Sequence, residues 1–247
     1  MKKLLVIALL FVGMFAFFQT SSSTSYSASA PQAVASFPAQ TQEVLALGDS
    51  LTVGYGPDSD KMAWRGEFIA QAKAAGTDIH MNMLAVGGWS TADVLPQLAA
   101  TLLSVKPDLV IVCLGTNDSA DPTLNGFEAR YSKIIATILD MSDALIEPCF
   151  IQYSAIGVPF ATTQGKANDA IFRIMANRGV FEPGGNPRFV GWADLSVIPW
   201  TYLSSDGVHL TPEGYKVMGR QIYRGAQGGE GWTVIPVETV PLDGHRP

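Results

Sequence analysis

Short apolar runs alternate along the chain with longer stretches of helical periodicity. The apolar runs predict β-strands at residues 44–47, 79–86, 109–114, 148–153 and 189–195. Between these runs, apolar residues recur at spacings of three and four, the pattern of a helix that buries one face. This pattern predicts helices around residues 64–75, 95–103, 127–138 and 171–175, and a last helix over 211–225.

Strands that alternate with helices predict an α/β fold, in which a five-stranded parallel sheet is covered by helices on both faces. The chain has 247 residues, 47% of them hydrophobic, which suits one domain with an ordinary core. No internal repeat and no second composition regime is present. We therefore predict a linker over residues 31–42, one domain over residues 43–227 and a Gly- and Pro-rich tail over residues 228–247.

The first thirty residues have the composition of a secretory signal peptide. Lys2 and Lys3 precede the apolar run 4–18, which leads into a Ser- and Thr-rich stretch ending at Ala30. The apolar run has about 15 residues and is short for a helix that spans a bilayer. We expect cleavage after Ala30, or alternatively after Ala35, and export to the extracellular space or periplasm. An uncleaved N-terminal membrane anchor is the alternative.

The charge balance narrows the range of partners. The chain carries 16 Lys and Arg against 22 Asp and Glu, a net charge of −6 that becomes −8 once residues 1–30 are removed. No basic surplus is available to neutralise phosphates, so we expect neither a nucleic-acid partner nor an anionic membrane surface. The high apolar content also excludes intrinsic disorder.

The two cysteines, Cys113 and Cys149, both lie inside apolar runs that predict strands. Cysteine in such a place is often a small buried hydrophobic residue, so we favour two buried thiols. A disulfide stays open as the alternative, because export would bring both residues into an oxidising compartment. The sequence has no HExxH motif, no paired Cys-x-x-Cys and no P-loop, so we expect no metal and no nucleotide cofactor.

Four polar clusters lie at the predicted strand ends or just before the last helix. They are residues 48–51 (Gly-Asp-Ser-Leu), 87–90 (Gly-Gly-Trp-Ser), 115–118 (Gly-Thr-Asn-Asp) and 206–209 (Asp-Gly-Val-His). In open α/β sheets, ligands bind beyond the carboxyl ends of the strands. The order and placement of the clusters therefore predict a single functional site.

In these four clusters the sequence resembles the GDSL esterases of the SGNH hydrolase superfamily, over residues 43–225. The resemblance implies a flavodoxin-like three-layer α/β/α sandwich that hydrolyses ester or thioester bonds without a metal or organic cofactor. It also implies that Ser50 is the nucleophile and that Asp206 and His209 complete its triad. Gly88 and Asn117 match the donors of the oxyanion hole.

The chemistry of the residues supports these roles independently. A serine hydroxyl needs a base to take its proton, and that base must be held by a third group. His209 is the candidate base, since His80 lies in a predicted strand and His245 lies in the tail. The backbone N–H of Ser50 is a third candidate oxyanion donor. Asp49 and Asp118, which adjoin site residues, are interpreted as hydrogen-bonding residues of loops or caps.

The substrate is less well defined. Aromatic side chains near the clusters could line a cleft: Tyr55, Trp89, Phe160, Trp200 and Tyr202. They suit either an acyl-chain pocket or stacking on sugar rings. We favour a monomeric esterase for short- to medium-chain acyl substrates, on a small molecule or a polymer. An O-acetyl esterase acting on extracellular polysaccharide is the alternative, and a non-catalytic carbohydrate- or lipid-binding protein is a weaker one.

Overall fold

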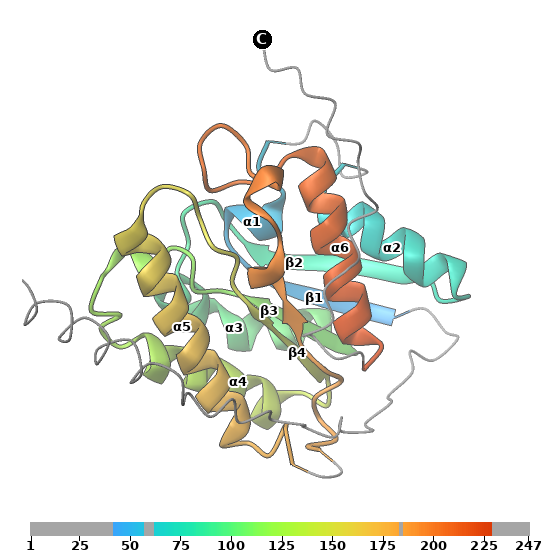
Figure 1. Cartoon of the computed structure of the whole chain (residues 1–247). Helices are drawn as coiled ribbons and strands as arrows, with labels where there is room; N and C mark the ends of the chain where they lie inside the picture. Colours follow the sequence, from blue (N-terminus) through green and yellow to red (C-terminus); the bar gives the residue numbers. More distant parts are fainter. Residues whose placement is uncertain (1–41, 57–61, 183–184, 229–247) are drawn as a thin grey trace, which may run out of the picture. The chain divides into compact units, whose positions relative to one another are not determined.

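The computed structural model describes residues 42–56, 62–182 and 185–228 (Figure 1). The predicted signal peptide, the linker apart from Gln42, and the tail beyond Gly228 lie outside these described residues. Gln42 belongs to the first strand rather than to the linker, because it continues the pairing with the neighbouring strand at Ile79.

One five-stranded parallel sheet forms the centre of the described structure. Its strand order is β2-β1-β3-β4-β5, which is the flavodoxin-like order. The predicted fold class is therefore confirmed. The strands are β1 (Gln42–Gly48), β2 (Ile79–Ala85), β3 (Leu109–Cys113), β4 (Leu145–Phe150) and β5 (Ala193–Asp194).

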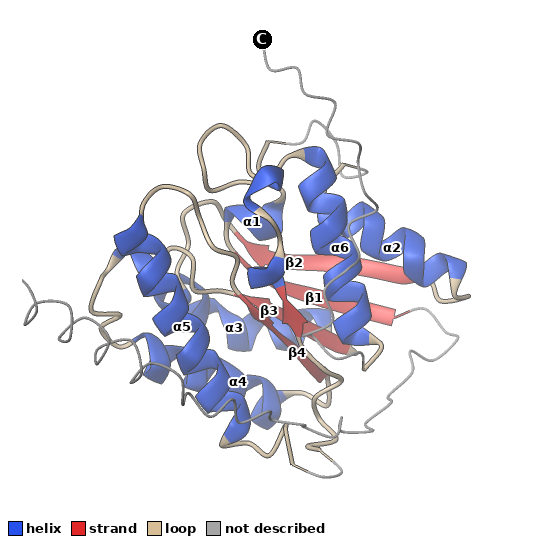
Figure 2. Ribbon diagram, viewed as in Figure 1, coloured by secondary structure: helices blue, strands red, loops and turns tan. Residues whose placement is uncertain are grey.

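Helices cover both faces of the sheet (Figure 2). Helices α2 and α6 lie together on one face, and α3, α4 and α5 lie on the other. The α-helices are α1 (Ser50–Val53), α2 (Trp64–Ala74), α3 (Thr91–Val105), α4 (Phe127–Met141), α5 (Val158–Ala176) and α6 (Pro212–Ala226). The 3₁₀ helices are η1 (Asp118–Ala120), η2 (Leu195–Val197) and η3 (Trp200–Tyr202). Among the described residues, none of these helices has the length and apolar character to cross a membrane.

Strand β1 shows why the central strands read as unbroken apolar runs. Val44 and Ala46 pack into the core beneath α2 and α6, whereas Leu45 and Leu47 pack into the core beneath α3, α4 and α5. All four side chains are fully buried. A parallel strand with helices on both faces has no solvent side, so it needs apolar residues at every position.

The fourth and fifth strands depart from the sequence prediction. Strand β4 begins at Leu145, three residues before the predicted start, and ends at Phe150. Glu147 and Pro148 hide its start, because they break the apolar run although Glu147 is fully buried. Strand β5 is limited to two residues, and Phe189 makes only an isolated bridge to Ile146.

Helix α5 begins at Val158, well before the segment that its apolar periodicity predicts. Its first half turns polar side chains inward. Gln164 donates to the carbonyl of Gln152 and accepts from the N–H of Ser154, and Asn168 makes equivalent bonds to both backbone groups of Ile151. These amides hold the chain that leaves β4, and their polarity conceals the buried face of the helix.

Cys113 on β3 and Cys149 on β4 are both buried, as the sequence predicts. Their sulfurs lie 2.9 Å apart, and both residues are free thiols in this structure. Burial, together with the neighbouring Cys113, raises the pKa of the Cys149 thiol well above its ordinary value. The pair is thus part of the core beneath α2 and α6.

The carboxyl ends of β1, β2 and β3 are aligned. Gly48, the last residue of β1, pairs with Ala85 on one side and with Cys113 on the other. The segments that follow these strands therefore leave the sheet at one edge. The chain order reverses between β1 and β3, and such switch points are where open α/β sheets bind ligands.

Candidate active site

Three side chains form a hydrogen-bonded chain at this edge of the sheet. Nε2 of His209 lies 2.8 Å from Oγ of Ser50, and Nδ1 of His209 lies 2.6 Å from Oδ2 of Asp206. A carboxylate can only accept, so Nδ1 carries the proton and Nε2 accepts from the serine hydroxyl. This arrangement is the one in which a histidine can remove the serine proton.

Ser50 is held by the short helix α1, which directly follows β1. The helix ends at Gly54, whose φ of 80° allows the left-handed turn there. The side chains of Trp64 and Arg65 both donate to the carbonyl of Thr52, at 2.8 and 2.9 Å. Because α1 is too short to be stable alone, these bonds from α2 fix the position of Ser50.

Asp206 and His209 lie on one tight loop before α6. Oδ1 of Asp206 accepts from the backbone N–H groups of Val208 and His209 and from the hydroxyl of Ser204. The loop ends at Thr211, which caps α6 by accepting from a backbone N–H of its first turn. The loop is thus fixed at both ends, and Oδ2 of Asp206 is left for the imidazole.

The ionised form of Asp206 is strongly favoured. Partial burial opposes ionisation, but it is outweighed by the hydrogen bonds from the His209 ring, two backbone amides and Ser204. These bonds hold the pKa of Asp206 well below its usual range. Asp206 therefore stays negative over the range in which proteins are normally studied, and can stabilise an imidazolium at His209.

The chain also presents donors for a developing oxyanion. Ser50 is the first residue of α1, so its backbone N–H has no partner within the helix. Asn117 follows β3, and its Nδ2 donates to the carbonyl of Trp89 at 2.8 Å. That bond uses one of the two amide hydrogens and leaves the second for another acceptor.

Gly88 lies in a β-turn that joins β2 to α3. The N–H of Trp89 donates to the carbonyl of Val86, and Gly88 has a φ of 84°. Gly88 is the third residue of this turn, and the second residue, Gly87, does not have a positive φ. A turn with a positive φ at its third residue alone is of type II, and glycine is strongly preferred there. The Gly88 N–H takes no part in the hydrogen bond of the turn, so it is free to act as a donor.

The described residues contain no group of three or more His, Cys, Asp or Glu side chains that could hold a metal. His80, the other described histidine, is exposed and pairs with Glu43 at 2.9 Å. Of the two described histidines, His209 is the one that contacts a serine hydroxyl.

Comparison with known proteins identifies the family of the chain. The profile of the GDSL-like Lipase/Acylhydrolase family matches residues 46–217. The chain belongs to this family. Among curated proteins, no sequence matches the chain.

Solved structures of esterases resemble this GDSL-like protein. A lipase/acylhydrolase from Enterococcus faecalis is 23% identical, with a TM-score of 0.59, and the match covers 75% of this chain and 96% of that one. A family 3 carbohydrate esterase from Clostridium thermocellum is 22% identical, with a TM-score of 0.60 and coverages of 74% and 94%. A variant of Axe2, an acetyl xylan esterase from Geobacillus stearothermophilus, is 15% identical, with a TM-score of 0.61 and coverages of 76% and 95%. At these identities the likenesses establish the fold.

The five predicted cleft residues lie in different surroundings. The ring of Tyr55 lies 4.7 Å from that of His209, centroid to centroid, and is 61% exposed. Trp89 and Tyr202 are partly buried and pack against the two cores. Phe160 is half-buried in the first turn of α5, and Trp200 is exposed in η3. Of these five, only Tyr55 makes a ring contact with a described residue of the Ser50 site.

The sequence does not reveal some residues that hold the site of this hydrolase. Trp64 and Arg65 are read from periodicity as part of a helix, yet they anchor α1. Thr91 and Arg130 bind the carboxylate of Asp118, a residue whose place in the sequence predicts only a loop or cap role. These contacts join segments far apart in the chain, so no local motif marks them.

Proposed function

We propose that this GDSL-like protein is a secreted serine esterase that hydrolyses carboxylic esters of short- to medium-chain acyl groups. The observation that carries the proposal is the continuous hydrogen-bonded chain from Ser50 through His209 to Asp206, at 2.8 and 2.6 Å. Secretion is supported by the leader-like composition of residues 1–30.

In the proposed reaction, Oγ of Ser50 attacks the ester carbonyl carbon while Nε2 of His209 takes the hydroxyl proton. The N–H groups of Ser50 and Gly88 and the amide of Asn117 stabilise the resulting oxyanion. The tetrahedral intermediate then expels the alcohol, which receives its proton from His209. Water, activated by the same histidine, hydrolyses the acyl-enzyme and releases the acid.

The surroundings of the His209 loop support an apolar acyl group. The N–H of Ala155 donates to the carbonyl of Gly207 at 2.7 Å, so the chain after β4 lies against this loop. Ile156 is 51% exposed there, and a methyl group at Gly207 would lie 3.3 Å from its Cγ2. With the exposed ring of Tyr55 over His209, this side chain offers apolar surface beside the loop that carries His209.

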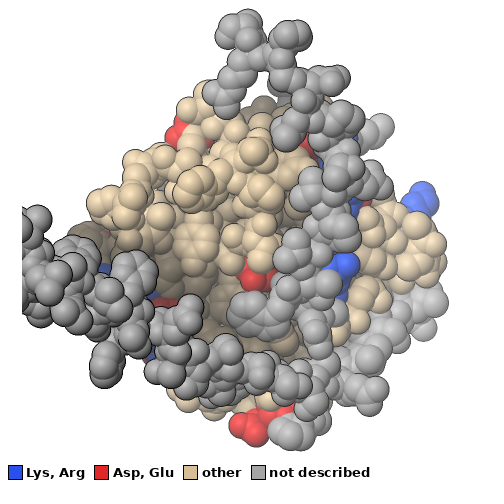
Figure 3. All heavy atoms as spheres, in the orientation of Figure 1, with Lys and Arg blue, Asp and Glu red and all other residues tan. Residues whose placement is uncertain are grey.

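The face shown in Figure 3 carries few charged side chains on its described surface between α5 and α6. The proposed acyl substrates need no charged recognition group.

A second candidate is an O-acetyl esterase that acts on extracellular polysaccharide. Two of the compared structures are a carbohydrate esterase and an acetyl xylan esterase. The exposed aromatic residues Tyr55 and Trp200 could stack on sugar rings, which gives this candidate support from the chain itself.

The decisive experiment measures hydrolysis of p-nitrophenyl esters from acetate to palmitate, together with acetate release from acetylated xylan. Ser50→Ala should lose several orders of magnitude in kcat. Ser104→Ala makes the same chemical change at an exposed position of α3 and should match the wild type. A maximum at medium chain length supports the acyl esterase, and activity confined to acetyl groups with preference for xylan supports the second candidate. Near wild-type turnover by Ser50→Ala would refute the assignment of the nucleophile.

A further inference from the structure

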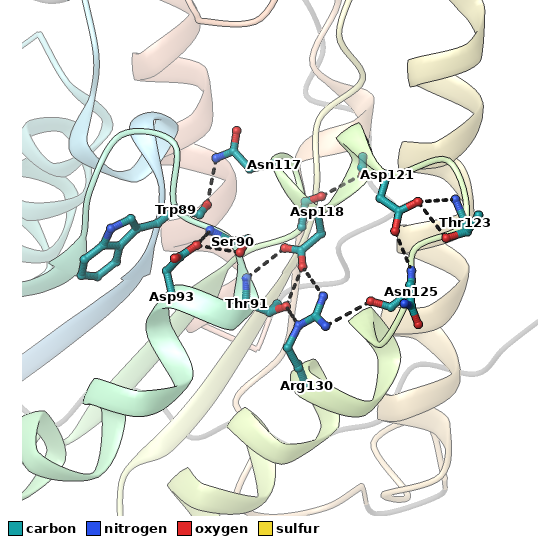
Figure 4. A network of polar contacts seen from close by, with 12 residues as sticks. Trp89, Ser90, Thr91, Asp93, Asn117, Asp118, Asp121, Thr123, Asn125 and Arg130 are labelled. Atoms are coloured by element: carbon teal, nitrogen blue, oxygen red, sulfur yellow. Dashed lines mark hydrogen bonds and ion pairs between the residues drawn. The ribbon is translucent and has the colours of Figure 1, made fainter.

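A buried polar network joins the two loops that carry Gly88 and Asn117 (Figure 4). Asn117 itself donates to the carbonyl of Trp89. The next residue, Asp118, accepts from the backbone N–H of Thr91 at 3.0 Å and from its hydroxyl at 2.6 Å. Two successive residues of the loop after β3, Asn117 and Asp118, therefore hydrogen-bond to the chain at the start of α3.

Arg130 reaches this contact from α4 and completes it (Figure 4). Its Nη2 donates to Oδ1 of Asp118 at 3.1 Å, and its Nε donates to the hydroxyl oxygen of Thr91 at 2.9 Å. Its Nη1 donates to the carbonyl of Asn125 at 3.0 Å. The planar guanidinium thus binds three groups at once, which a lysine ammonium on a flexible stem cannot reproduce in the same geometry.

Burial makes this network rigid. Thr91 is fully buried, the side chain of Asp118 is 1% exposed, and that of Arg130 is 31% exposed. A buried carboxylate that loses a partner is left partly uncompensated, which is costly. The two loops therefore have one favourable arrangement, in which all three side chains are paired.

We propose that Thr91, Asp118 and Arg130 are positioning residues for the oxyanion hole. The inference rests on the proposed serine esterase function. Gly88 lies one residue before Trp89, and Asn117 lies one residue before Asp118, so each donor is adjacent to a residue held by the network. Donors stabilise an oxyanion only when they are fixed at the place where its charge develops, so a small shift of either loop weakens them.

A purely structural role for the same residues makes a different prediction. It would lower the stability of the fold but leave the chemical step unchanged in molecules that remain folded. A positioning role lowers kcat and weakens the binding of a tetrahedral anion, with little effect on KM.

The test compares Thr91→Val with Thr91→Ser. Valine has nearly the shape of threonine and keeps the backbone N–H but lacks the hydroxyl that links Asp118 to Arg130, whereas serine retains it. Arg130→Gln is a second variant, on a partly exposed side chain, in case Thr91→Val does not fold. Arg173→Gln is the matched control, because it removes an exposed arginine–carboxylate pair with Glu128 on the same helix α4.

For each variant, kcat and KM are measured on one p-nitrophenyl ester, and the inhibition constant of an alkylboronic acid is measured as a mimic of the tetrahedral anion. Thr91→Val and Arg130→Gln should lose about 10- to 100-fold in kcat with KM within about twofold. The boronic acid should bind them more weakly by a similar factor. Thr91→Ser and Arg173→Gln should stay close to the wild type.

Two failures are distinguishable in this design. Wild type that hydrolyses no ester would refute the proposed function, and this inference with it. Active wild type, combined with folded Thr91→Val and Arg130→Gln variants of unchanged kcat and unchanged boronic acid affinity, would overturn the positioning role alone. A lowered melting temperature without a kinetic change counts as that second outcome.

Discussion

Asp49, the residue before the predicted nucleophile, is expected to make the stability of the fold depend on pH. Its side chain is 1% exposed, and Oδ1 accepts from the N–H of Leu51 at 2.9 Å. Oδ2 has no hydrogen-bond partner among the described residues. Burial raises the pKa of Asp49 to about 6, against an ordinary value of 3.8, although the bond from Leu51 opposes the shift.

The sign of the effect follows from proton binding. The folded chain holds the Asp49 proton at pH values where the unfolded chain has already released it. The contribution of Asp49 to stability is therefore fully present below the ordinary pKa and falls as the pH rises to the folded pKa. A shift of about two units corresponds to about 3 kcal/mol of unfolding free energy.

Asp49→Asn removes this ionisation but can still cap α1. Any constant cost of the amide cancels when the variant is compared with the wild type at two pH values. Between about pH 3.5 and about pH 7.5, the unfolding free energy of the variant should rise by about 2.5 kcal/mol relative to the wild type. Urea unfolding monitored by circular dichroism at several pH values measures this difference.

Asp121→Asn is a control of opposite sign. Hydrogen bonds from the hydroxyl and backbone of Thr123 and from the backbone of Asn125 lower the pKa of Asp121, which is exposed. Its contribution to stability is present above the ordinary pKa and is lost as the pH falls. The reasoning for Asp49 would be refuted if the unfolding free energy of Asp49→Asn, minus that of the wild type, stayed constant or fell as the pH rose.

Three further predictions concern the core and the chemistry. Gly219→Ala should lower the free energy of unfolding in urea by about 2 kcal/mol, because a methyl group at this position would overlap the carbonyl oxygen of Trp64. A variant as stable as the wild type would contradict the close packing of α2 on α6. Asp206→Asn should lower kcat by about 10³-fold or more in ester hydrolysis, since the amide cannot stabilise an imidazolium, and a small loss would argue against its role. Cys113 and Cys149 should resist a thiol reagent in the native protein and react only after unfolding, because both are buried; rapid native labelling would contradict their burial.

The sheet was predictable because its pattern is local. Each of β1 and β3 is a short apolar run, and parallel strands need crossover helices between them. The limits of that reasoning appear at Glu147 and Gln164. Both are buried polar residues, and each interrupts the apolar pattern at the element that contains it. Burial of a polar group is decided by tertiary contacts, which periodicity does not record.

The polar residues of the candidate site could be placed together from the sequence, but the surroundings of its aromatic residues could not. Asp206 and His209 are three residues apart on one loop, and the polar cluster at Ser50 follows a strand, so fold-level reasoning brings the three together. The cleft residues were harder to assign, because an aromatic residue next to a motif can pack either inward or outward. Trp89 packs against the core, whereas Tyr55 lies exposed over His209.

Two parts of the candidate site are supported by different helices. The candidate site residues lie in short motifs at the sheet edge, but α1 is held by Arg65 of α2, and the loop after β3 is held by Arg130 of α4. Arg65 donates to backbone carbonyls of α1, the helix that begins at Ser50, whereas Arg130 donates to Asp118 after β3 and to Thr91 at the start of α3. Ile156 takes no part in the described hydrogen bonds of Arg130, and it lies against the His209 loop instead. Acyl preference could therefore change at Ile156 without disturbing the oxyanion donors, whereas a change at Arg130 should reduce turnover of every ester by a similar factor.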